Sequence, residues 1–327
     1  MELEEELKKR KDFFDEELEK FLRDGNPEEL YDAARHLPIA GGKRLRPILS
    51  MVSCEAVSGE ISMVVPLALA VEIVHTFTLV HDDIMDKSKL RRSQPSVHMK
   101  YGEPTAIMAG DLLFTKGFES MHRMTVSPSV FKNVEYGLID TVKEICEGQQ
   151  LDMSFQDRHD VSEGEYLKMI LKKTAVFFQY ACEAGGIVGG ADSEKSNALS
   201  EYGKNLGLAF QIHDDYLDMS SDSDTIGKDI GNDIRNGKKT LIAVHALNNA
   251  SRSDKKILEN IFGNKDASEE EIKQVYDAFK RTGSIDYAKK KAIWYSKKAI
   301  ESLGILERSE AQELLKKIAD FSIKRVK

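Results

Sequence analysis

The chain has 327 residues and a mass of 36.8 kDa, with 41% hydrophobic and 31% charged residues. This composition excludes disorder and fits a globular protein with a sizeable core. A net charge of −8 argues against a nucleic-acid partner, because phosphate backbones attract basic surfaces. Three widely spaced cysteines indicate neither a disulfide framework nor a zinc site, and they fit a reduced cytoplasmic protein.

Apolar residues recur at helical spacing along almost the whole chain, beginning with Leu3, Leu7, Phe14, Leu18 and Phe21. Further helices are predicted at residues 27–36, 45–57, 63–86, 104–122, 129–156, 163–187, 192–219, 239–249, 254–262, 268–281, 284–303 and 308–325. No segment alternates with a period of two, so no sheet is expected.

The domain organisation and the membrane relationship follow from the same pattern. The most apolar stretch, residues 63–74, contains Pro66 and Glu72 and is shorter than the roughly 20 residues that span a bilayer. We therefore expect no transmembrane segment. No linker composition interrupts the helices, and residues 1–327 are predicted to form a single all-α domain.

The strongest chemical signal is a pair of acidic clusters, HDDIMD at residues 81–86 and HDDYLD at residues 213–218. Aspartates at positions i, i+1 and i+4 point to one side of a helix, where their charges repel. The C-terminal end of a helix also disfavours anions, so each cluster needs a counter-cation. Magnesium bridging to substrate phosphates fits all-oxygen ligands. A single copy would be read as a solvated helix end, whereas two copies favour metal binding.

Basic residues accompany both clusters. GGKRLRP at residues 41–47 places a flexible turn with three cations before a helix start, which suits phosphate binding. Arg91 and Arg92 follow the first cluster, and Lys228 and Lys238 follow the second. Acidic and basic residues therefore lie close together in the sequence at both places. This pattern indicates a site that binds metal ions and two anionic groups of a substrate, and simple salt bridges are the alternative.

The chemically distinctive segments, in chain order, are GGKRLRP (41–47), His75, HDDIMD (81–86), RRSQP (91–95), Lys173-Thr174, FQIHDDYLD (210–218) and GKDIGNDIRNGKKT (227–240). On these segments the chain resembles the trans-isoprenyl diphosphate synthases, also called the polyprenyl synthetase family. Ser93 and Ile242 depart from the family's usual glycine and proline, but neither removes a charge. The resemblance implies an isoprenoid synthase-type helical bundle around a central cavity, a homodimer, and head-to-tail condensation of isopentenyl diphosphate with an allylic diphosphate.

The resemblance also implies roles for individual residues. The principal magnesium ligands are Asp82, Asp86 and Asp214, supported by Asp83, Asp215 and Asp218. The cations for the allylic diphosphate are Arg91, Lys173, Lys228 and Lys238. The groups for isopentenyl diphosphate are Lys43, Arg46, His75 and Arg92. The oxygens facing the allylic cation are the Thr174 hydroxyl, the Lys173 carbonyl and the Gln211 amide oxygen.

Product length is expected to depend on residues just before the first cluster. Phe77 lies five residues before Asp82 on the cavity-lining face, and Thr78 beside it is small. A single aromatic at this place resembles the archaeal-type geranylgeranyl diphosphate synthases, which make a twenty-carbon product. Ile73 and Val74 lie one turn deeper. One alternative is that Phe77 is an ordinary core residue. A farnesyl or longer-chain diphosphate synthase of the same family is the alternative for the product.

Other classes of protein stay open at this point. An inactive regulatory subunit is disfavoured because all six aspartates are present. A phosphohydrolase built on the His-Asp pairs at residues 81–82, 159–160 and 213–214 gives no role to residues 41–47. A class I terpene cyclase is disfavoured by that same segment and by the second acidic cluster. The allylic starter, the metal, the oligomeric state and the pathway are not specified by the sequence.

Overall fold

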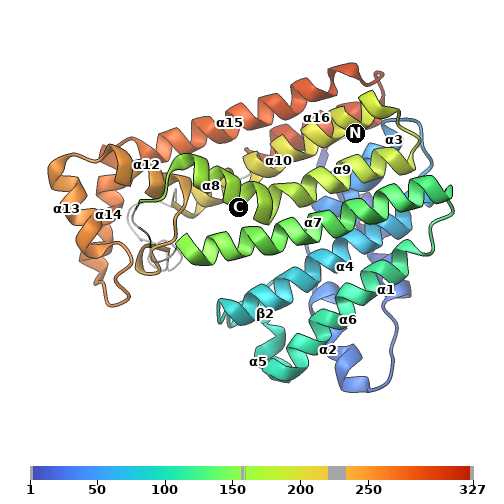
Figure 1. Ribbon diagram of the computed structural model, residues 1–327, viewed down its shortest axis with the longest axis horizontal. Helices are drawn as coiled ribbons and strands as arrows, with labels where there is room; N and C mark the ends of the chain where they lie inside the picture. The colour runs from blue at the N-terminus through green and yellow to red at the C-terminus, as the bar shows by residue number, and fades with distance from the viewer. Residues whose placement is uncertain (1–2, 156–157, 159, 220–232, 325–327) are drawn as a thin grey trace. The chain divides into compact units, whose positions relative to one another are not determined.

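The computed structural model describes residues 3–155, 158, 160–219 and 233–324, and regular structure there is helical apart from one short hairpin (Figure 1). The predicted all-α fold class is therefore confirmed. The chain divides into two compact units, and each is described by itself. The first comprises Met1–Gly137, Ala181–Leu199 and Ile305–Leu315, and the second Leu138–Tyr180, Ser200–Gly304 and Lys316–Lys327. A single domain over residues 1–327 stays a prediction.

The helices that lie wholly in the first unit are α1 (Leu3–Phe21), α2 (Glu28–Ile39), α3 (Leu45–Glu55), α4 (Ile61–Met85), α5 (Val97–Tyr101) and α6 (Glu103–Met121). Helix α4 packs along α6 (Figure 1). A Cβ atom on Gly117 of α6 would lie 2.4 Å from Cγ2 of Val74, and one on Gly110 would lie 2.2 Å from Nε2 of His81. These two glycines therefore allow the close approach of the helix that carries the first acidic cluster.

Helix α4 is longer than the apolar stretch recognised in the sequence. Its 25 residues are long and apolar enough to cross a membrane, and no other helix of the described residues meets that criterion. However, 61% of its most apolar window is buried inside the protein. Leu67, Val71 and Val74 are completely buried, so the apolar sequence is accounted for by the core of the first unit.

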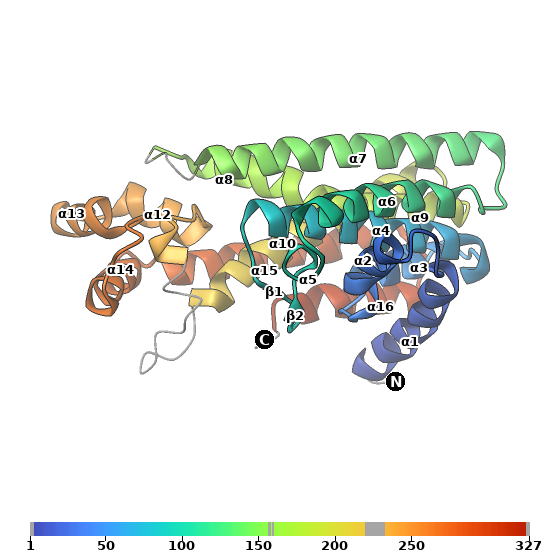
Figure 2. The ribbon, with the colours of Figure 1, turned by 90° about the horizontal axis from the view of Figure 1, so that it is seen from below.

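A small hairpin corrects the expectation that the chain contains no sheet. Strands β1 (Leu90–Arg91) and β2 (Gln94–Pro95) pair antiparallel, next to α5 (Figure 2). Arg92 and Ser93 form the turn with φ of 51° and 60°. Hairpin turns with two positive φ angles are usually marked by Asn-Gly, and two-residue strands are too short to alternate. The sequence therefore gave no strand signal here.

The elements that lie wholly in the second unit are α8 (Glu163–Ile170), the π-helix η1 (Leu171–Ala175), α12 (Leu241–Asn249), α13 (Arg252–Ile261), α14 (Glu269–Arg281) and α15 (Ser284–Ser302). Ser162 and Glu165 form a capping box that begins α8. The core around these elements includes Tyr166, Ile242 and Phe279, each no more than 1% exposed.

The division between the units falls within or beside the remaining elements, which are α7 (Pro128–Phe155), α9 (Val176–Val188), α10 (Ser193–Met219), η2 (Leu303–Ile305) and α16 (Glu310–Ser322). The single helix predicted at residues 163–187 is interrupted, because η1 separates α8 from α9. A π-turn inserts one extra residue, which shifts the spacing of the apolar residues by only one position, and a single shift of this kind is easily missed in the sequence.

Candidate active site

The basic turn at residues 41–44 begins the site in the first unit. Gly41 and Gly42 have φ of 92° and 148°, and Arg44 is left-handed with φ of 51°. A Cβ atom on Gly42 would lie 2.9 Å from the guanidinium carbon of Arg92. Glycine is therefore required here both for backbone conformation and for the approach of Arg92.

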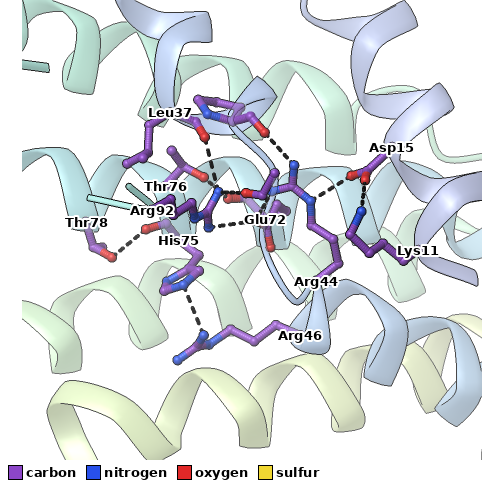
Figure 3. A network of polar contacts seen from close by, with 12 residues as sticks. Lys11, Asp15, Leu37, Arg44, Arg46, Glu72, His75, Thr76, Thr78 and Arg92 are labelled. Carbon is purple, nitrogen blue, oxygen red and sulfur yellow. Dashed lines mark hydrogen bonds and ion pairs between the residues drawn. The ribbon is translucent and has the colours of Figure 1, made fainter. Parts of the chain in front are cut away.

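Arg44 anchors this turn to its surroundings, as Figure 3 shows. Its Nε donates to Asp15 Oδ1 at 2.7 Å, its Nη1 donates to Glu72 Oε1 at 2.5 Å, and its Nη2 donates to the Pro38 carbonyl. Burial opposes its charge, but Glu72 and Asp15 raise the pKa of Arg44 above its ordinary value. Arg44, the middle of the three cations in GGKRLRP, therefore has a structural role. It lies between Lys43 and Arg46, the two residues expected to bind isopentenyl diphosphate.

Arg92 also holds the turn. Its Nη1 donates to the Leu37 carbonyl at 3.1 Å and to the Gly41 carbonyl, and its Nη2 lies 3.5 Å from Glu72 Oε1 (Figure 3). Burial lowers the pKa of Arg92. The sequence assigned Arg92 to isopentenyl diphosphate only, and the structure adds this supporting role.

Arg46 and His75, which are both expected to bind isopentenyl diphosphate, lie together. Arg46 Nη1 is 3.1 Å from His75 Nε2 (Figure 3). Burial, followed by the charges of Arg46 and Arg92, lowers the pKa of His75 well below its ordinary value. A neutral imidazole can accept the Arg46 hydrogen bond, so His75 helps to orient the guanidinium.

The first acidic cluster lies at the C-terminal end of α4. Arg91 donates from Nε and Nη2 to Asp83 Oδ1 at 2.9 and 2.5 Å, and its Nη2 is 4.0 Å from Asp82 Oδ2. Asp83 is 1% exposed, and burial raises the pKa of its carboxyl group. Its Oδ2 is also buried and has no hydrogen-bond partner among the described residues. A cation or its water shell would satisfy that oxygen.

His81 supports the helix pair instead of the acidic cluster. Its Nε2 lies 3.1 Å from the Ile107 carbonyl of α6, and its ring meets Phe77 edge-on with centroids 4.9 Å apart. The imidazole is therefore engaged with α6, which weakens the hypothesis of a His-Asp metal site at residues 81–82.

Phe77 begins a short run of aromatic rings between α4 and α6. Its centroid is 5.1 Å from that of Phe114, which is 5.2 Å from that of Phe118. Thr78 Oγ1 donates to the His75 carbonyl at 2.8 Å, so its side chain is held against its own helix. The sequence analysis missed Phe114 and Phe118, although their i, i+4 spacing within the predicted helix 104–122 was the available signal.

The second acidic cluster has its own network in the second unit. Asp215 is 3% exposed, and it accepts from Tyr166 Oη at 2.7 Å and from Gln211 Nε2 at 3.3 Å. Lys238 Nζ lies 3.8 Å from Asp215 Oδ1 and 3.4 Å from Asp233 Oδ2. Burial raises the pKa of Asp215 to about 6. Asp215 therefore organises Lys238 and Gln211 at the cluster that contains Asp214.

The π-helix η1 carries Lys173 and Thr174. Thr174 Oγ1 donates to Gln211 Oε1 at 3.0 Å, so two of the three predicted catalytic residues are in contact. Lys173 Nζ pairs with Asp152 of α7 at 2.6 Å. Asp152 was missed, because one acidic residue on the polar face of a helix carries no signal in the sequence. π-turns are frequent at functional sites because they expose backbone groups.

Two glycines hold the π-helix between its neighbours. A Cβ atom on Gly148 of α7 would lie 2.3 Å from the backbone nitrogen of Lys173. One on Gly207 of α10 would lie 2.6 Å from Cα of Ala175. Direct contact between backbones therefore fixes the segment that presents the Lys173 carbonyl and the Thr174 hydroxyl.

The donor set fits a hard divalent cation that is only partly enclosed by protein. Within the described part of the chain, no three His, Cys, Asp or Glu side chains converge closely enough to hold a metal by themselves. Carboxylates with few protein contacts suit magnesium, which keeps waters and binds substrate phosphates. The orphaned Oδ2 of Asp83 agrees with this arrangement. Lys228, which is predicted to bind the allylic diphosphate, lies outside the described residues.

Comparison with known proteins identifies the family. The model of the family described as "Polyprenyl synthetase" matches residues 27–279. A short chain isoprenyl diphosphate synthase of Methanothermobacter thermautotrophicus is 45% identical, with 99% of both chains covered. A geranylgeranyl diphosphate synthase of Methanosarcina mazei is 43% identical, with 99% of this chain and 98% of the relative covered. The crystal structure of geranylgeranyl pyrophosphate synthetase from Pyrococcus horikoshii has a TM-score of 0.93 and 41% identity, covering 99% of this chain and 98% of that one.

The chain belongs to the polyprenyl synthetase family. It is a trans-isoprenyl diphosphate synthase, a prenyltransferase with the all-α isoprenoid synthase fold. Enzymes of this family use isopentenyl and allylic diphosphates with a divalent metal ion. This identification replaces the phosphohydrolase hypothesis.

Proposed function

We propose that the protein makes geranylgeranyl diphosphate by successive additions of isopentenyl diphosphate to shorter allylic diphosphates. The run of aromatic rings formed by Phe77, Phe114 and Phe118 supports this product length. Phe77 lies one helical turn before the first acidic cluster. The names of relatives such as the Methanosarcina mazei enzyme support the same product. Farnesyl or longer chains are the alternative within the family.

The acidic clusters are proposed to bind magnesium through Asp82, Asp86 and Asp214. When bound, the metal would neutralise the charge that develops on the leaving diphosphate. Arg91, Lys173, Lys228 and Lys238 would add fixed positive charge to the same group. Preorganised cations stabilise such developing charge without reorganisation.

The allylic cation would face oxygens that carry partial negative charge but do not attack it. The Thr174 hydroxyl donates its hydrogen to Gln211, which leaves its oxygen lone pairs to face a substrate. The Lys173 carbonyl on the π-helix would act in the same way. The proton released after bond formation is assigned to the departing diphosphate, because no protein base is evident among the predicted site residues.

Isopentenyl diphosphate is proposed to bind Lys43, Arg46, His75 and Arg92. The contact between Arg46 and His75 supports this set, because it orients a guanidinium beside the basic turn. Arginine can bind a diphosphate with two parallel hydrogen bonds. A homodimer, magnesium as the physiological metal and a cytoplasmic location remain predictions of the family resemblance.

Product analysis tests the proposed chain length. The purified enzyme is incubated with magnesium, isopentenyl diphosphate and each short allylic starter, and the dephosphorylated products are separated by chromatography. We expect a dominant twenty-carbon product, with longer chains from Phe77→Ala and shorter ones from Thr78→Phe. Displacing a packed ring costs about 1–3 kcal/mol, enough to slow the next addition by roughly one to two powers of ten.

The matched control is Phe131→Ala, which removes a ring that packs on His122 outside the run. It should leave the product unchanged. An unaltered product from Phe77→Ala would assign the floor of the cavity to another helix. Release of phosphate without chain elongation would contradict the proposed reaction itself.

A further inference from the structure

The outer face of α15 is basic, although the protein as a whole is acidic. The chain has a net charge of −8, whereas α15 carries five lysines against Asp286 and Glu301. Lys290 and Lys297 are exposed and have no ion pair within the part of the chain that the structure describes. Their charge is therefore available to an external anion.

A tryptophan lies in the middle of this basic face. Trp294, the single tryptophan of the chain, is 46% exposed. At 3.6 residues per turn, Lys290, Trp294 and Lys297 share one side of the helix. Asp286 and Glu301 lie at the two ends of that same side, so the positive charge is concentrated around Trp294. The opposite side is buried through Ala288, Ala292, Ser296 and Ala299. Exposing a large indole to water is unfavourable, whereas the boundary between lipid headgroups and acyl chains suits its amphipathic ring.

A groove beside Trp294 adds apolar surface. It has a volume of about 610 Å³, and its apolar wall includes Leu167, Leu171 and Leu208. Lys298 borders the same groove, with its Nζ 4.0 Å from the centroid of the indole ring. Around the groove, Lys168, Lys204 and Lys298 outnumber Glu201 and Glu301, and the apolar wall can receive an acyl chain, which an acidic protein surface does not supply.

We infer that the outer face of α15 docks the enzyme onto an anionic lipid bilayer, with Trp294 inserted at the interface and Lys290 and Lys297 against the headgroups. This inference rests on the proposed function in one respect, because a twenty-carbon diphosphate is an amphiphile that partitions into bilayers. The enzyme would thus release its product at the surface that receives it. The binding itself requires no catalysis.

The single tryptophan makes the test direct, because all tryptophan fluorescence of the full-length protein reports on position 294. The protein is titrated with vesicles of equimolar phosphatidylcholine and phosphatidylglycerol, without substrates. We expect a blue shift of the emission, quenching by brominated acyl chains, and neither effect with pure phosphatidylcholine. The double variant Lys290→Gln, Lys297→Gln should bind about 25-fold more weakly, from about fivefold for each lysine near the surface.

The matched control is Lys256→Gln, Lys273→Gln, which removes the same charge from exposed positions on α13 and α14. It should bind vesicles like the wild type, and both double variants should retain solution activity. Equal loss in both variants, or no quenching by brominated lipid, would overturn the inference. An equivalent shift with polyglutamate and none with vesicles would assign the face to an acidic protein. Because no substrate is present, an inactive enzyme would leave these results unchanged.

Discussion

At the scale of single residues, the side chains proposed to bind substrate differ from those that hold the surrounding structure in place. In the turn at residues 41–47, Arg44 is fixed by three partners, while Lys43 and Arg46 stand on either side of it. Asp215 similarly organises Lys238 and Gln211 in the second unit. The sequence analysis recognised the types of residue in both places, but it could not separate these two roles.

The metal assignment predicts that Asp82→Ala and Asp214→Ala abolish condensation while the fold is retained. Each change removes a proposed ligand and relieves repulsion between neighbouring carboxylates. The turnover number should fall by about 100- to 1,000-fold, as for the loss of a major electrostatic group. Steady-state kinetics at saturating magnesium and circular dichroism check both expectations. Near-normal turnover in either variant would refute the assignment.

The two anion sites should respond separately to mutation. Lys43→Ala and Arg46→Ala should raise the KM for isopentenyl diphosphate about 10- to 100-fold, since a hydrogen bond to a charged group contributes about 1.5–3 kcal/mol. The KM for the allylic substrate should change little. Arg23→Ala, which removes an exposed arginine of the first unit, is the control. Equal losses for both substrates would merge the two sites into one.

His75 should make folding stability depend on pH. Its pKa is lowered by burial, so below about pH 6.5 the unfolded chain binds a proton that the folded chain does not. The free energy of unfolding should therefore fall as the pH falls, by at most about 1.4 kcal/mol per pH unit from this group. Urea denaturation of the wild type and His75→Gln between about pH 7 and about pH 5 measures the difference. Parallel pH profiles would show that His75 is not the source.

At the scale of elements, helical periodicity predicted most of the fold. The helices over residues 45–57, 104–122 and 284–303 appear as α3, α6 and α15 with ends shifted by no more than two residues. The hairpin at residues 90–95 and the π-helix at residues 171–175 were missed. The strands are too short to alternate and the π-helix shifts the apolar spacing by only one position, so neither leaves a clear pattern in the sequence. Both contain residues that are proposed to bind substrate.

The π-helix should be sensitive to the glycines that flank it. Gly148→Ala places a methyl group 2.3 Å from the Lys173 nitrogen, so the backbone must move. We expect the turnover number to fall at least about tenfold, because small displacements of catalytic groups are costly. The KM for isopentenyl diphosphate should stay unchanged.

The control for this element is Gly164→Ala in α8, where an added Cβ meets nothing within 4 Å. It should leave the kinetics unaltered. Full activity of Gly148→Ala would show that the catalytic oxygens tolerate a displaced η1.

At the scale of the whole molecule, the predicted homodimer needs an apolar surface. Ile107 and Met108 of α6 are 42% and 51% exposed. The variant Ile107→Glu, Met108→Glu should sediment as a monomer if this surface is the interface, because buried unpaired charges disrupt association. Met63→Glu, an exposed methionine on the first turn of α4, is the control. Sedimentation velocity measures the oligomeric state of the wild type and both variants. A monomeric wild type would contradict the predicted homodimer.

The hydrogen bonds of Arg44 also give the first helix a role in the proposed substrate site. The family match starts at residue 27, and α1 lies entirely before it. Yet Asp15 of α1 accepts a hydrogen bond from the Arg44 guanidinium. Arg44 is also the left-handed residue that caps the N-terminus of α3. Removing the residues before the family match would leave the buried Arg44 with one carboxylate fewer and should loosen the turn that carries Lys43 and Arg46. We therefore expect the first helix to influence the affinity for isopentenyl diphosphate, although none of its residues is proposed to contact the substrate.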